Sequence, residues 1–234
     1  MKAHGIELPG RGRRDDLPGI RPLVAASLAS FAAFGLLAIL VAADLTASAD
    51  RAVTLALQSV ASLPLDLVAN ANTFIGQATV TSVIAVAVAA VLWRSERGGA
   101  WLAVGLLAVT VAGEVALKFA FDHPAPPPVF DRSLWDPLGV HVVSPSSFPS
   151  GHVARVTFLA ILLAGLARGG FARLPAVALV AYSVWSRVYL GDHWLSDAVG
   201  GLALGAGAGL AALAWIARCR ARATDVTSGQ APMV

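Results

Sequence analysis

The chain has few charged residues and almost no cysteine. Only 13% of its 234 residues are Asp, Glu, Lys or Arg, about half of the share that is usual in a soluble domain. The single cysteine, Cys219, excludes a fold held together by intrachain disulfides. A hydrophobic content of 57% excludes a disordered chain, and a formal net charge of +3 is too small to indicate a nucleic-acid-binding protein.

Long uncharged stretches are present instead. Residues 23–43 and 73–93 each run for 21 residues without a charge, which is enough to cross the roughly 30 Å hydrocarbon core of a bilayer. Four further apolar stretches lie near residues 98–121, 150–167, 174–190 and 194–217. We therefore expect an all-α fold, an integral membrane bundle of six transmembrane helices that forms one domain over residues 23–217. Residues 1–22 and 218–234 are expected to be N-terminal and C-terminal tails.

Two of the connections between these stretches are long. Residues 44–72 combine charges and a proline with apolar residues at helical spacing, a pattern that predicts one interfacial amphipathic helix rather than a span. Residues 122–147 contain six prolines, so this segment is expected to be an irregular loop. Loops of this length in a compact domain are often functional.

The placement of lysine and arginine predicts the orientation in the membrane. With the N-terminus inside, 12 of the 17 basic residues fall in cytoplasmic segments, as the positive-inside rule requires. Both tails are then cytoplasmic, and the proline-rich loop is extracytoplasmic. The expected location is the plasma membrane.

Side chains capable of chemistry collect at the outer ends of four predicted spans. Ionisable groups are costly inside a membrane and are functional candidates by default. The third span ends at Lys118, the fourth begins at Ser150, Gly151 and His152, the fifth ends at Ser186 and Arg187, and the sixth begins near His193 and Asp197.

The spacing of these residues has a chemical meaning. His193 and Asp197 are four residues apart, so on a helix the carboxylate can orient one imidazole nitrogen and leave the other free to attack. The turn at Ser150 and Gly151 places backbone N–H groups at a helix N-terminus, which suits an anion such as phosphate. His152, on a different helix, is placed to give a proton to a departing oxygen.

Two basic residues complete the predicted anion site. The Arg187 guanidinium is a planar fork that matches two phosphate oxygens, whereas the Lys118 ammonium is a point charge. Lys118 also lies four residues after Glu114, so a buried structural ion pair is the alternative role for this lysine.

The motifs in this region resemble those of a known family. Residues 186–197, SRVYLGDHWLSD, fit the pattern SRxxxxxHxxxD, and residues 149–152 read PSGH. In this order and separation they resemble the type 2 phosphatidic acid phosphatase superfamily, the lipid phosphate phosphatases. The likeness covers roughly residues 23–217, and the six-span architecture resembles that of the bacterial membrane members.

The resemblance implies a role for each matching residue. His193 would be the nucleophile that forms a phosphohistidine, Asp197 would orient it, and His152 would be the acid and then the base. The phosphoryl oxygens would be held by Lys118, Ser150, Gly151 and Arg187. The family's phosphatases use no metal or other cofactor. The partners implied are a lipid phosphate substrate and membrane lipids, with no nucleic acid.

One position departs from the family pattern. The first family motif is KxxxxxxRP, and here Ala125 stands where the arginine belongs. Arg155, three residues after His152 on the same helical face, is our candidate for the missing phosphate ligand. The alternatives are that Arg155 snorkels or pairs with Glu114 or Asp122, with Arg132 of the loop as a minor replacement.

Three other residues near the motifs are assigned no catalytic role. His123 and His141 lie in the proline-rich loop and are expected to be surface histidines, although His123 is the better functional candidate because it lies beside Ala125. Asp192 is expected to be a solvated loop acid.

The predicted function is that of a membrane phosphatase whose substrate is a polyprenyl diphosphate, phosphatidic acid or phosphatidylglycerol phosphate. Nothing in the sequence decides among the three, and analogy with bacterial members favours the first. Two alternatives stay open. One is a lipid phosphotransferase that uses the same phosphohistidine, and the other is a catalytically impaired lipid-binding protein, suggested by Ala125.

Overall fold

The computed structural model describes residues 19–93, 97–135, 145–167 and 170–228, and all regular secondary structure within these ranges is helical. The expected all-α fold is confirmed. Six helices lie where spans were predicted: α1 (Ile20–Ala42), α4 (Ala78–Trp93), α5 (Arg97–Ala120), α6 (Gly151–Leu166), α7 (Arg173–Tyr189) and α8 (Leu195–Ser228). The remaining elements are α2 (Ala47–Gln58), α3 (Leu63–Ile75) and the short 3-10 helices η1 (Pro128–Phe130) and η2 (Gly170–Ala172).

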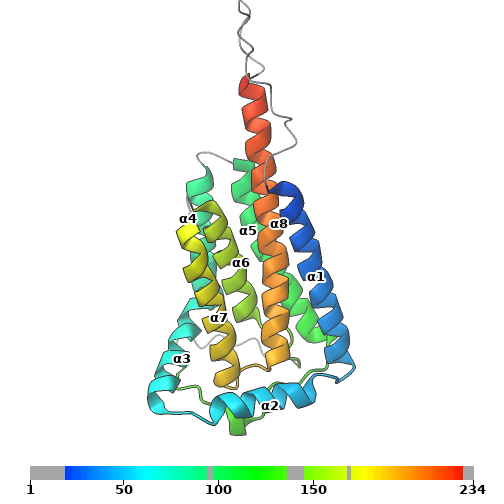
Figure 1. The fold of residues 1–234 in the computed structure, drawn as a ribbon, viewed down its shortest axis with the longest axis vertical. Coiled ribbons are helices and arrows are strands. Elements are labelled where there is room, and N and C mark those ends of the chain that lie inside the picture. Colours follow the sequence, from blue (N-terminus) through cyan, green and yellow to red (C-terminus); the bar gives the residue numbers. More distant parts are fainter. Residues whose placement is uncertain (1–18, 94–96, 136–144, 168–169, 229–234) are drawn as a thin grey trace, which may run out of the picture.

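The helices form a bundle with one broad end (Figure 1). Helices α1 and α4 to α8 run along its long axis, while α2 crosses the broad end and α3 slants toward it. The first residues of α1 and the last turns of α8 lie at the opposite, narrow end. Both ends of the described chain are therefore on the same side of the bundle.

Not every helix that lies where a span was predicted is long enough to cross a membrane. By length and composition, α1, residues 101–120 of α5 and residues 195–221 of α8 can each cross a membrane, and the bent pair α3 and α4 would be a fourth if it is a single span. Helix α6 is apolar but has only 16 residues. The count of six spans therefore remains a prediction.

Two predicted boundaries are corrected by the structure. Residues 44–72 do not form one amphipathic helix, because the chain leaves α2 at Gln58 and starts α3 at Leu63, with Pro64 in the first turn. The uncharged stretch 73–93 does not form one helix either. Its first residues belong to α3, and a bend of 50° separates α3 from α4.

A close approach between α8 and α6 fixes the geometry of the broad end. The notable feature of α8 is a face of glycines at four-residue intervals, Gly201, Gly205 and Gly209. A Cβ added at Gly201 would overlap the carbonyl oxygen of Ser150, and one at Gly205 would overlap that of Ala154. Small residues allow helix backbones to approach this closely in a membrane. The start of α6 is thereby held against the start of α8.

Candidate active site

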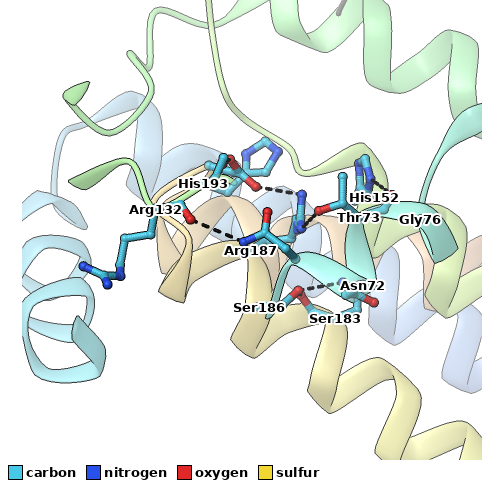
Figure 2. Close-up of polar contacts among 12 residues, drawn as sticks. Asn72, Thr73, Gly76, Arg132, His152, Ser183, Ser186, Arg187 and His193 are labelled. Atoms are coloured by element: carbon cyan, nitrogen blue, oxygen red, sulfur yellow. Dashed lines mark hydrogen bonds and ion pairs between the residues drawn. The ribbon is translucent and has the colours of Figure 1, made fainter. Parts of the chain in front are cut away.

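Four helix ends meet at the broad end of the bundle and carry the predicted site residues. Lys118 lies in the last turn of α5, Arg187 in the last turn of α7, and Asp197 in the first turn of α8. His152 lies in the first turn of α6, and His193 lies in the short connection between α7 and α8. Figure 2 shows His152, Arg187 and His193 in one group.

Backbone hydrogen bonds tie the motif segments to one another. The Ser150 N–H donates to the Asp197 carbonyl oxygen at 2.9 Å, which joins the PSGH turn to α8. The Ser147 N–H donates to the His123 carbonyl oxygen at 2.8 Å, and the His193 N–H donates to the Arg187 carbonyl oxygen at 3.2 Å. These backbone bonds hold the motif segments in register without using any side chain of the predicted site.

The pair His193 and Asp197 is arranged as its spacing predicts. Nδ1 of His193 lies 3.4 Å from Oδ2 of Asp197, which also accepts the Trp194 N–H at 2.8 Å. The Asp197 carboxylate is fully buried. Because this carboxylate faces Nδ1, the hydrogen of a neutral imidazole is held there, and Nε2 keeps the lone pair needed for attack.

His123 is buried, and the expectation of a surface residue is wrong. Its Nε2 lies 3.4 Å from Oδ1 of Asp197 and 3.5 Å from the Ser196 hydroxyl. Ser196 in turn donates its N–H and its hydroxyl to the two carboxylate oxygens of Asp50 on α2, at 2.8 and 2.7 Å. The Asp197 carboxylate therefore has a histidine on each side. The place of His123 beside Ala125 and five residues after Lys118 is the sequence signal that could have pointed to this contact. His141 lies outside the described residues.

Arg187 has a partner on each terminal nitrogen. Its Nη1 lies 2.7 Å from Oδ2 of Asp192, and its Nη2 donates to the Thr73 hydroxyl at 2.7 Å. Asp192 is therefore an ion-pair partner of Arg187 and not the solvated loop acid expected from the sequence. Arg187 is 3% exposed, and its Nε has no hydrogen-bond partner within the described part of the chain. The same holds for the fully buried hydroxyl of Ser150.

His152 is held through one ring nitrogen. Its Nε2 lies 3.1 Å from the carbonyl oxygen of Thr73 on α3, and a carbonyl oxygen only accepts hydrogen bonds. Nε2 therefore carries a hydrogen in this arrangement, and Nδ1 is the nitrogen that gains and loses a proton. The ring packs on Gly76, where an added Cβ would overlap it. Sequence reasoning missed Thr73, which no motif marks.

Arg155 pairs with Glu114, so the geometry favours the ion-pair alternative over the phosphate ligand. Nη1 of Arg155 donates to Oε2 of Glu114 at 2.8 Å, while Nε and Nη2 donate to the Gly76 carbonyl oxygen at 3.2 and 3.1 Å. Glu114 also lies 3.4 Å from the Lys118 ammonium and packs so closely on Gly151 that a Cβ there would overlap the carboxylate. We call Glu114, Arg155 and the Gly76 carbonyl the brace.

Arg132, the minor candidate for the missing arginine, is held elsewhere. Its Nε and Nη2 each donate to a carboxylate oxygen of Asp66 on α3 at 2.7 Å. These hydrogen bonds raise the pKa of the guanidinium further above its ordinary value. Arg155 and Arg132, the two candidates to replace the arginine missing at position 125, are therefore both held by carboxylate partners.

A helical membrane bundle with two histidines, a buried carboxylate and basic side chains at one end defines a class of protein that binds and transfers phosphoryl groups. The sequence comparisons agree with this class. Residues 99–221 match the PAP2 superfamily, and the chain belongs to this family. The predicted family is thereby confirmed.

Solved structures share the fold. The chain is similar to the crystal structure of the first transmembrane PAP2 type phosphatidylglycerolphosphate phosphatase from Bacillus subtilis, with a TM-score of 0.64 and 22% identity over 88% of this chain and 99% of that one. It is also similar to Aquifex aeolicus LpxE, with a TM-score of 0.55 and 17% identity over 70% of this chain and 94% of that one. No curated protein matches the chain in sequence.

Proposed function

We propose that this protein is a membrane phosphatase that removes phosphate from a lipid phosphate or diphosphate through a phosphohistidine on His193. The observation that carries the proposal is the arrangement of His193, Asp197 and His152 around Arg187. Membership of the PAP2 superfamily and the fold shared with transmembrane phosphatases support the same class of enzyme.

In the first step, Nε2 of His193 attacks phosphorus and the bond from phosphorus to the leaving oxygen breaks. Asp197, facing Nδ1 at 3.4 Å, stabilises the positive charge that develops on the imidazole. His152, protonated on Nδ1, gives that proton to the departing oxygen. The products are the free alcohol or lipid phosphate and a phosphohistidine.

In the second step, water attacks the phosphorus and the bond from phosphorus to nitrogen breaks. His152, now neutral at Nδ1, accepts the proton of the water. Inorganic phosphate leaves, His193 is regenerated, and His152 is again protonated for the next substrate. A lipid hydroxyl in place of water would make the enzyme a phosphotransferase.

The phosphoryl oxygens are assigned to buried donors that lack other partners. The Ser150 hydroxyl and Nε of Arg187 are both buried without a hydrogen-bond partner among the described residues, and such groups call for an explanation. The N–H groups in the first turn of α6, starting at Gly151, and the Lys118 ammonium complete the proposed set of phosphate ligands. Fixed positive charge of this kind is the main contribution to phosphoryl transfer, so the proposed mechanism is metal-independent.

The substrate is proposed to enter from the lipid phase with its headgroup at the broad end of the bundle. A polyprenyl diphosphate, phosphatidic acid and phosphatidylglycerol phosphate all present a terminal phosphate to such a site. The narrow end carries the start of α1 and the end of α8 (Figure 1). If both tails are cytoplasmic, as the basic residues predict, the site is extracytoplasmic in the plasma membrane.

The decisive experiment measures phosphate release from these three lipids by the detergent-purified protein in the presence of a chelator. We expect release by the wild type, and none by His193→Ala or His152→Ala variants that unfold at the wild-type temperature. Labelled phosphate trapped on His193 would identify the intermediate. Transfer of the label to a lipid would favour the phosphotransferase, and lipid binding without turnover would favour an impaired protein, as Ala125 suggests.

A further inference from the structure

Thr73 is the only described residue that contacts both Arg187 and His152 through hydrogen bonds, as Figure 2 shows. Its hydroxyl oxygen accepts from Nη2 of Arg187 at 2.7 Å, and its carbonyl oxygen lies 3.1 Å from Nε2 of His152. Thr73 lies on α3, outside the residues that match the family. The family motifs therefore assign it no role.

The last turn of α3 is fixed from two sides. The buried Asn72 amide donates to the hydroxyl of Ser186 on α7 at 2.6 Å. Three residues after Thr73, the Gly76 carbonyl oxygen accepts two hydrogen bonds from Arg155 on α6. Thr73 is consequently held between the helices that carry Arg187 and His152, and its position does not depend on a bound ligand.

The hydrogen-bond chemistry of the Thr73 hydroxyl leaves one donor unused in this contact. A guanidinium has only donors, so the Thr73 oxygen acts as the acceptor toward Arg187. The hydroxyl hydrogen is then free to point at a phosphoryl oxygen held by the same guanidinium. A preorganised donor next to a phosphate-binding arginine stabilises developing negative charge without reorganisation.

We propose that Thr73 is a further positioning residue of the site, whose hydroxyl sets the orientation of the Arg187 guanidinium for a phosphate group. This inference rests on the proposed function, in that the phosphate group belongs to the substrate. The Thr73 carbonyl adds a second effect, because it keeps the hydrogen of His152 on Nε2 and leaves Nδ1 for proton transfer.

Replacing Thr73 by valine or by serine separates the effect of the hydroxyl from the effect of the side-chain shape. Thr73→Val keeps the branched shape and removes the hydroxyl, whereas Thr73→Ser keeps the hydroxyl. Thr81→Val on α4 is the matched control, because among the described residues the buried Thr81 hydroxyl bonds only to the nearby backbone carbonyls of Gln77 and Ala78. All four proteins are compared by thermal unfolding, by kcat and KM for phosphate release, and by calorimetric binding of inorganic phosphate.

We expect Thr73→Val to raise KM and weaken the binding of inorganic phosphate about 10-fold to 100-fold, the loss typical of a hydrogen bond to a charged group. Thr73→Ser should stay within about threefold of the wild type, by the same reasoning, and Thr81→Val should be unchanged. The pH dependence of kcat should be the same in all four, because the backbone carbonyl that faces His152 is retained.

The outcomes distinguish this inference from the proposed function. If the wild type releases phosphate and Thr73→Val has the same KM and the same affinity for inorganic phosphate as the wild type, the inference is wrong and the proposed function stands. Equal losses in Thr73→Val and Thr73→Ser would also overturn it, because the effect would then follow the shape of the side chain. Absence of phosphate release by the wild type would overturn the proposed function, while a loss of phosphate binding in Thr73→Val would still support the contact.

Discussion

The brace joins three parts of the bundle, and its central residue is buried. Arg155 is 8% exposed and binds Glu114 of α5 and the carbonyl of Gly76 at the break between α3 and α4. Replacing Arg155 by alanine leaves the Glu114 carboxylate buried, with the Lys118 ammonium at 3.4 Å as its remaining ionic partner. It also leaves the Gly76 carbonyl without these two donors.

The expected loss of stability follows from these contacts. Breaking a buried ion pair from one side typically costs about 3–5 kcal/mol. The remaining Lys118 contact reduces that cost, whereas the loss of the Gly76 bonds adds to it, so we expect Arg155→Ala to lower the free energy of unfolding by about 3 kcal/mol. Glu114→Gln should lower the free energy of unfolding by less than Arg155→Ala does. The double variant should lose about 1–2 kcal/mol less than the two single losses added together, because both substitutions break the same ion pair.

The assay is reversible unfolding in mixed micelles for the wild type, both single variants and the double variant, with phosphate release measured on the same preparations. At temperatures where Arg155→Ala is folded, its turnover should stay within about twofold of the wild type, whereas Arg187→Ala should abolish turnover; loss of a direct ligand to the transferred group typically costs 100-fold or more. An unchanged free energy of unfolding combined with a large rise in KM would show that Arg155 is a phosphate ligand after all.

Three further predictions concern the surroundings of the site. His123→Asn should lower kcat about 10-fold with little change in KM, because His123 contacts Asp197, the carboxylate that positions the proposed nucleophile His193; equal kcat in the two proteins would contradict this. Gly205→Ala should destabilise the protein by about 1–3 kcal/mol by overpacking, as measured by thermal unfolding, while Gly35→Ala, where nothing lies within 4 Å of the added Cβ, should be neutral or slightly stabilising. Asp192→Asn should tighten the binding of inorganic phosphate several-fold in calorimetry, since it removes the carboxylate that lies 2.7 Å from Nη1 of Arg187 and competes with phosphate for it; weaker binding would show that this ion pair positions Arg187 instead.

The sequence predicts the parts of the site that follow from local spacing. His193 and Asp197 meet because they are four residues apart, and the glycines of α8 pack on α6 because they share one helical face. Uncharged runs locate α1 and α8 for the same reason, since length and hydrophobicity are local properties. Each of these predictions depends on one helix at a time.

Contacts between distant segments were not predictable in the same way. The sequence leaves Arg155 as a phosphate ligand, a snorkelling side chain or a partner of Glu114 or Asp122, and only the packing of α5 against α6 selects Glu114. His123 and Asp192 lie in polar connections, where an exposed side chain is the usual outcome. His123 is nevertheless buried and Asp192 is drawn into an ion pair with Arg187, because segments distant in sequence meet at these helix ends, and no periodicity in the sequence encodes that meeting.

Helices α2 and α3 supply contacts to the candidate site that the family motifs do not mark. Asp50 of α2 fixes Ser196 beside the Asp197 carboxylate through two hydrogen bonds, and Thr73 of α3 contacts Arg187 and His152. Both residues precede the matched region, 99–221. A protein reduced to the motif-bearing helices would keep every residue named by the motifs and lose the groups that orient them. Since misplacement by about 1 Å can cost a hundredfold in rate, we expect α2 and α3 to be as necessary to the proposed reaction as the segments that carry the two histidines.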